Sequence, residues 1–66
     1  MQKYKSGDIV TCPYDGIDNI EKDKKYRVRY TFDKCTMFDG ADILSIETLD
    51  KNWIGLFGNG LFKNKN

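Results

Sequence analysis

The sequence predicts an all-β domain in which five short strands form a small barrel. Segments rich in β-branched and aromatic residues recur at a spacing of roughly ten residues, as is typical of small sandwiches and barrels. Turns containing glycine, aspartate or asparagine separate these segments. No long segment repeats its apolar residues with the helical period. Closure into a barrel would also leave no strand edge exposed.

The length and composition fit one small domain covering residues 1–66. Aromatic residues make up 14% of the chain, which argues against disorder. Eleven basic residues nearly balance ten acidic ones, whereas a dedicated nucleic-acid binder usually has a larger basic excess. The chain shows neither a signal peptide nor a run of apolar residues long enough to cross a membrane. We therefore expect a cytoplasmic protein with no membrane partner.

The first strand is predicted at residues 9–13, where alternation places Val10 and Cys12 on one face. Pro13 ends this strand or confines it to a sheet edge, because proline has no N–H group to donate. Residues 14–24 then form a long connection that contains two isoleucines. We expect these isoleucines to anchor the connection against the body of the domain.

The clearest strand covers residues 25–33. Its period of two predicts one buried face and one solvated face. The buried face would carry Tyr26, Val28, Tyr30 and Phe32. The solvated face would carry Arg27, Arg29 and Thr31.

The second half of the chain adds three strands. A hairpin tip at residues 34–40 precedes them, and the glycine-rich residues 58–60 predict a tight corner before the last one. The first two are predicted at residues 41–49 and 52–57, and residues 61–63 are predicted to return as a last short strand or as a helical turn followed by one.

The fourth strand is apolar on both faces. Alternation places Trp53 and Phe57 on one face and Ile54 and Leu56 on the other. We expect Ile54 and Leu56 to belong to the core, which leaves the face of Trp53 incompletely covered. The alternative is that Trp53 is itself the central core residue. Gly55 lies between the two rings and indicates a close approach by another group.

Four short motifs run through the chain: Gly7-Asp8-x-Val10-x-Cys12, Lys24-Lys25-Tyr26-x-Val28, the acidic turn before Trp53, and Leu61-Phe62-Lys63. Together with the order of strand, long loop, strand, hairpin, hairpin, one-turn corner and short strand, they resemble small SH3-like proteins encoded by bacteriophages. The resemblance implies a five-stranded SH3-like barrel and a phage origin, which would place the protein in the cytoplasm of a host bacterium. It implies no settled function.

The residue types disfavour an enzyme. The chain contains no histidine, the commonest general acid–base group. Cys12 alternates with Val10 and is predicted to be a small core residue, not a nucleophile. Two cysteines without histidine do not complete a usual zinc site, and the calcium-loop pattern is absent. The sequence therefore predicts no catalytic residue, no metal and no cofactor.

The charge distribution and the apolar fourth strand predict a non-enzymatic protein-binding module. Residues 21–29 carry five basic and two acidic side chains, whereas residues 36–50 carry four acidic and no basic ones. These charge runs are either two oppositely charged solvated faces that attract each other across the fold or a bipolar surface that orients a partner. The partner would be a host factor that the protein binds or inhibits, or a second copy of itself. The candidate partner-binding residues are Tyr14, Trp53 and Phe57 as apolar anchors and Arg27 and Arg29 as orienting charges.

A second hypothesis is nucleic-acid binding through Lys25, Arg27 and Arg29. Small barrels hold single strands on such basic stripes when aromatic side chains are interleaved with them. The interpretation of this stripe that we favour is a solvated sheet face whose charges pair with acidic residues of a neighbouring strand.

Overall fold

The computed structural model describes residues 3–64, apart from the side chains of residues 35, 38 and 64. It is all-β, as predicted. The strands are β1 (Ile9–Thr11), β2 (Lys25–Cys35), β3 (Ala41–Glu47), β4 (Trp53–Gly58) and β5 (Lys63–Asn64), and two short 3-10 segments, η1 (Thr36–Phe38) and η2 (Asn59–Leu61), connect them.

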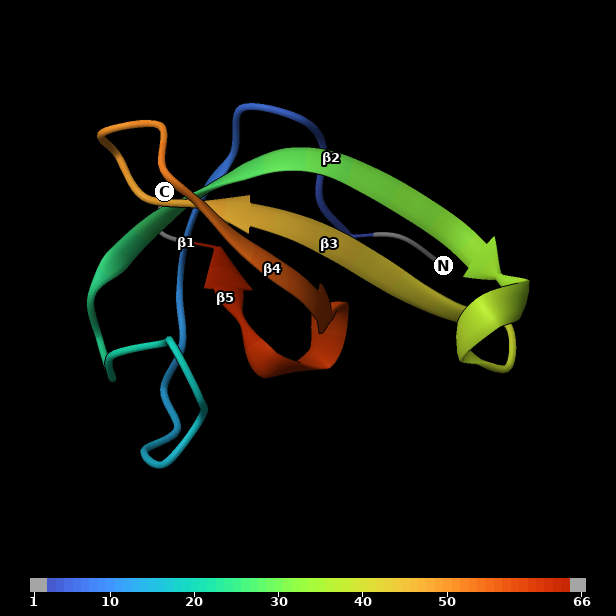
Figure 1. Cartoon of the computed structure of the whole chain (residues 1–66), viewed down its shortest axis with the longest axis horizontal. Coiled ribbons are helices and arrows are strands. Elements are labelled where there is room, and N and C mark those ends of the chain that lie inside the picture. Colours follow the sequence, from blue (N-terminus) through green and yellow to red (C-terminus); the bar gives the residue numbers. More distant parts are fainter. Residues whose placement is uncertain (1–2, 65–66) are drawn as a thin grey trace.

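The five strands form one antiparallel sheet in the order β4-β3-β2-β1-β5 (Figure 1). β2 and β3 are the longest pair and extend away from the body as a curved hairpin that ends in η1. Within the described residues no strand pairing joins β4 to β5. The sheet is therefore open along this side, and the predicted closed barrel is not confirmed.

A bulge in β2 changes which face its side chains occupy. Val28 pairs with Ile46, but Tyr30 pairs with Ser45, so Arg29 has no partner opposite it in the ladder. One extra residue in a strand shifts the alternation of all later residues by one position. Tyr30 is consequently exposed, and the prediction that Tyr30 and Phe32 continue the buried face of Tyr26 and Val28 is wrong.

A second bulge has the same effect in β4. Gly55 pairs with Ile46 and Trp53 pairs with Glu47, which leaves Ile54 as the extra residue. Phe57 therefore turns toward the core and Leu56 toward solvent. The predicted placement of Ile54 in the core is confirmed, although it is only half-buried, whereas the predicted placement of Leu56 in the core is wrong.

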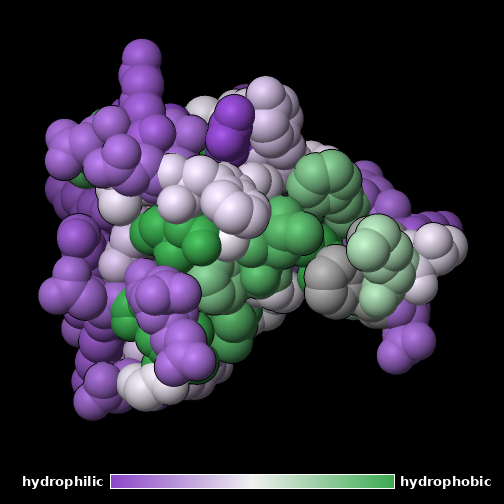
Figure 2. Space-filling view, in the orientation of Figure 1, coloured by the Kyte–Doolittle hydropathy of each residue, from purple (hydrophilic) through white to green (hydrophobic). Residues whose placement is uncertain are grey.

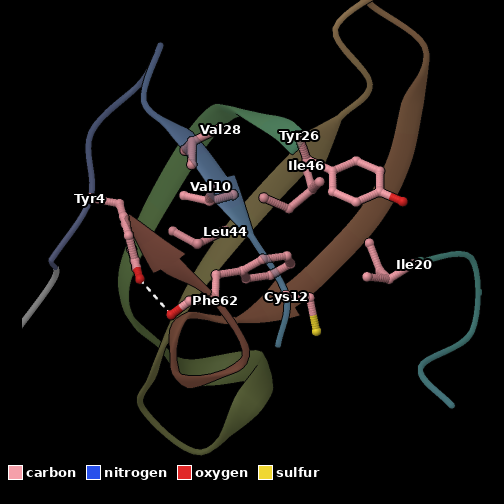
Figure 3. Packing of buried hydrophobic residues seen from close by; sticks show 9 residues of the cluster. All are labelled: Tyr4, Val10, Cys12, Ile20, Tyr26, Val28, Leu44, Ile46 and Phe62. Carbon is pink, nitrogen blue, oxygen red and sulfur yellow. Dashed lines mark hydrogen bonds between the residues drawn. The ribbon is translucent and has the colours of Figure 1, made fainter. Parts of the chain in front are cut away.

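The core lies on the concave side of the sheet and is closed by the connection before β2 and by the segment after β4 (Figure 3). Cys12 is fully buried, as the alternation of the first strand predicts. Ile20 is buried and Ile17 packs against the cluster, so the two isoleucines anchor the long connection as expected. The buried cluster comprises Tyr4, Val10, Cys12, Ile20, Tyr26, Val28, Leu44, Ile46 and Phe62.

One hydrogen bond ties the two ends of the described chain together. The Tyr4 hydroxyl donates to the carbonyl oxygen of Phe62 at 2.7 Å, and both residues are buried (Figure 3). Burial, with a smaller contribution from the nearby Asp8 carboxylate, raises the pKa of Tyr4 above its ordinary value. The neutral hydroxyl is thus the form that the folded state favours.

We expect Tyr4→Phe to lower the free energy of unfolding at neutral pH by about 0.5–1.5 kcal/mol, because the Phe62 carbonyl loses its donor. The contribution from the raised pKa of Tyr4 is present below the unfolded-state value of about 10 and is lost as the pH rises through the folded-state value. Urea titrations of both proteins at neutral and alkaline pH measure this. An equally steep alkaline loss of stability in Tyr4→Phe would contradict the assignment.

Candidate functional site

The face of the sheet opposite the core, called here the outer face, is built by β2, β3 and β4. Directly paired residues of antiparallel strands project on the same side, so the registers define three rows across this face. The rows are Arg27–Glu47–Trp53, Tyr30–Ser45–Leu56 and Phe32–Ile43–Gly58.

Four large side chains of these rows are exposed and together form what is called here the aromatic patch: Tyr30, Phe32, Trp53 and Leu56. Their exposed fractions lie between 43% and 56%. Ile43 and Ser45 of β3, which lie in the same rows, are each only 4% exposed. The four patch side chains thus cover Ile43 and Ser45 and are not isolated surface residues. Figure 2 shows hydrophobic side chains gathered in the middle of the molecule and continuing toward the β2–β3 hairpin.

The indole of Trp53 has a fixed polar contact on this face. Its Nε1 atom donates to the hydroxyl oxygen of Ser45 at 2.8 Å. Because Ser45 is buried, the indole ring must lie across β3 toward the middle of the sheet. An aromatic ring held in one orientation loses less side-chain entropy when a partner covers it. Trp53 is therefore an exposed but positioned ring, and the alternative that it is the central core residue is wrong.

One carboxylate sits between the two arginines of the outer face. Nη1 of Arg27 donates to Oε2 of Glu47 at 2.9 Å, and Nε of Arg29 lies 4.0 Å from Oε1. Arg27 also donates to the Leu49 carbonyl oxygen at 3.4 Å. The Glu47 side chain is only 11% exposed. The basic stripe therefore pairs with an acidic residue of the neighbouring strand, as expected if it is a solvated sheet face with internally paired charges.

Three of the five candidate residues come together in the structure. Arg27, Arg29 and Trp53 all lie on the outer face around Glu47. Phe57 lies on the opposite face, where its ring meets that of Phe62 edge-on at a centroid distance of 6.0 Å. It is therefore part of the core packing and not a surface anchor.

Tyr14 is exposed on the connection between β1 and β2. In the described part of the chain, no ring contact or hydrogen bond joins it to Trp53 or to Phe57. The structure instead supplies three patch residues that the sequence pattern assigned to the core: Tyr30, Phe32 and Leu56. No local sequence signal separates them from core residues, because the two bulges decide their side.

A shallow groove adjoins the patch at the start of β4. The long connection forms one wall and Trp53 with the β3–β4 turn forms the other. Beside this groove, the Lys24 ammonium group forms a salt bridge with the Glu21 carboxylate at 3.0 Å and lies over the Tyr26 ring. The charge of Lys24 is therefore already paired within the chain. The groove is lined by Asn19, Glu21, Lys24, Tyr26, Thr48, Trp53 and Ile54.

Among the side chains that the structure describes, which do not include that of residue 35, no three histidine, cysteine, aspartate or glutamate groups gather in a way that could hold a metal ion. Nor does any described helix have the length and apolar character needed to cross a membrane. A scan against models of protein families found no match for this chain. Searches of curated proteins and of solved structures also found no match.

Proposed function

We propose that the chain is a non-enzymatic protein-binding module and that the aromatic patch is its contact surface. The observation that carries this proposal is the set of four large side chains, each more than two-fifths exposed, over the buried Ile43. Contiguous exposed apolar surface of this kind marks interaction sites, since burying it on a partner is favourable. Tryptophan and tyrosine are also the side chains most often found to dominate binding energy.

We further propose that the fold is an SH3-like barrel whose sheet is incompletely closed. The described order of β1, long connection, β2, hairpin, β3, hairpin, β4, one-turn η2 and short β5 supports this assignment. The motifs that resemble phage-encoded SH3-like proteins support a phage origin. On that basis the partner is a protein of the host bacterium, which the module binds or inhibits in the host cytoplasm.

Two leucines of equal exposure allow a matched test of the contact surface. Leu56 lies on the patch and Leu49 on the β3–β4 turn, and each is 44% exposed. We expect Leu56→Ala to weaken binding of a captured host protein at least about tenfold, which corresponds to about 1.4 kcal/mol. Leu49→Ala should bind like the wild type.

The measurement is a pull-down of tagged protein from nuclease-treated bacterial lysate, followed by titration of the captured protein against both variants and Trp53→Ala. Circular dichroism confirms that each variant is folded. Equal binding by Leu56→Ala, Trp53→Ala and Leu49→Ala would show that the patch is not the contact surface.

Single-stranded nucleic acid is the second candidate partner. The observation that favours it is that Arg27 and Arg29 share the outer face with the rings of Tyr30 and Trp53. Against it, Arg27 is already paired with Glu47. Affinity for an oligonucleotide would fall with salt at a logarithmic slope of roughly 0.7 per neutralised phosphate, whereas an apolar protein interface responds weakly.

A further inference from the structure

We propose that the outer face selects a protein segment in which a carboxylate lies beside apolar side chains, and that Arg29 is the residue that binds this carboxylate. The inference rests on the proposed protein-binding function and specifies the chemistry of the partner. It follows from how the charges of this face are used.

The β2 bulge places Arg29 on the outer face although its position in the sequence alternates with Tyr30. Arg29 has no partner opposite it in the ladder, and its guanidinium lies both near Glu47 and over the Tyr30 ring, with its Cζ atom 5.3 Å from the ring centroid. Arg29 thus projects on the same side of the sheet as its neighbour Tyr30, which belongs to the patch. The guanidinium thus lies within cation–π distance of the Tyr30 ring.

The two arginines differ in what remains free to bind. Arg27 donates both to Glu47 at 2.9 Å and to the Leu49 carbonyl, and its side chain is 29% exposed. Arg29 approaches Glu47 only through Nε, at 4.0 Å, and its side chain is 48% exposed. Within the described residues, its two terminal nitrogens have no hydrogen-bond acceptor. Arg29 is therefore the cation of this face with open donors.

The charge of the face is complementary to an anion. The three cross-strand rows contain nine residues, and the bulged Arg29 is added to them. Among these residues Arg27 and Arg29 are cationic, and Glu47 is the one anion. A guanidinium presents parallel N–H donors that match a carboxylate in a bidentate pair. Apolar neighbours such as Tyr30 and Leu56 would exclude water around that pair once the partner is seated, which strengthens the interaction.

The partner segment should therefore combine two features. Aliphatic or aromatic side chains would cover Leu56 and Trp53, and an aspartate or glutamate next to them would reach Arg29. A segment with only apolar residues would leave the guanidinium covered and unpaired, which costs binding energy. This penalty makes Arg29 a determinant of specificity as well as of affinity.

The test uses a displayed library of random peptides selected against the full chain. We expect the enriched peptides to share an acidic residue next to aliphatic or aromatic ones. Arg29→Gln should bind a synthesised enriched peptide at least about tenfold more weakly. Arg29→Lys should recover only part of the loss, because it keeps the charge but not the fork of donors. Lys22→Gln, which removes an exposed charge from the long connection, should bind like the wild type.

Each other outcome overturns the inference. Enriched peptides that lack acidic residues, and bind Arg29→Gln as well as the wild type, would leave the protein-binding patch in place but remove the role of Arg29. Failure to enrich any peptide would count against both proposals. Tighter binding of fluorescent oligothymidylate than of any selected peptide, abolished in Arg29→Gln, would show that the anion is a phosphate. Concentration-dependent sedimentation that Leu56→Ala abolishes would show that a second copy covers the face.

Discussion

Leu44→Ala is expected to lower the free energy of unfolding by about 2–5 kcal/mol, whereas Leu56→Ala should change it by less than about 1 kcal/mol. The two leucines lie on neighbouring strands and undergo the same chemical change. Leu44 is completely buried among the core residues, so its truncation leaves a cavity. Leu56 is 44% exposed on the outer face, where solvent fills the space that is left.

Urea unfolding followed by circular dichroism measures both effects. A small domain buries relatively little of its surface and has a total stability of only about 5–15 kcal/mol, so Leu44→Ala removes a large part of it. If Leu56→Ala were as destabilising as Leu44→Ala, Leu56 would be a core residue. The aromatic patch would then be part of the core as well, and the proposed contact surface would be wrong.

Glu47→Gln is expected to lower the free energy of unfolding by about 1.5–3 kcal/mol. The carboxylate accepts a charge-assisted hydrogen bond from Arg27 and lies near the Arg29 guanidinium while almost buried. Hydrogen bonds to charged groups contribute about 1.5–3 kcal/mol, and the amide cannot neutralise either arginine. The loss arises because two nearby cations are left on one face without an anion.

The matched control is Glu21→Gln. Glu21 also pairs with a basic side chain at short distance, Lys24 at 3.0 Å, but its own side chain is 74% exposed. Exposed ion pairs contribute at most about 1 kcal/mol, so this variant should unfold close to the wild type. Equal destabilisation by the two substitutions in urea titrations would mean that Glu47 is an ordinary surface carboxylate. The nucleic-acid hypothesis predicts in addition that Glu47→Gln binds an oligonucleotide more tightly than the wild type, because neutralisation of the arginines is lost.

Of the candidate site, the sequence indicated the correct part of the sheet but only some of its residues. Arg27, Arg29 and Trp53 were predictable, because charged residues and a strand that is apolar on both faces are visible in the pattern. Tyr30 and Leu56 were not, because alternation counted from the start of each strand assigns both to the core. That count holds only while each residue faces one partner across the ladder.

The sequence by itself determined the fold class and the approximate extent of the strands. It also determined which residues at the beginning of the first two strands are buried. Val10, Cys12, Tyr26 and Val28 are buried as the alternation of apolar residues requires, because local periodicity specifies which face of a regular strand is apolar. Only the tertiary structure decided the rest of the outer face, namely Tyr30, Phe32 and Leu56. Its composition depends on two bulges, at Arg29 in β2 and Ile54 in β4, which arise from the pairing of these strands with β3. A bulge shifts every later side chain to the other side of the sheet, and pairing between distant segments leaves no periodic signal in either of them.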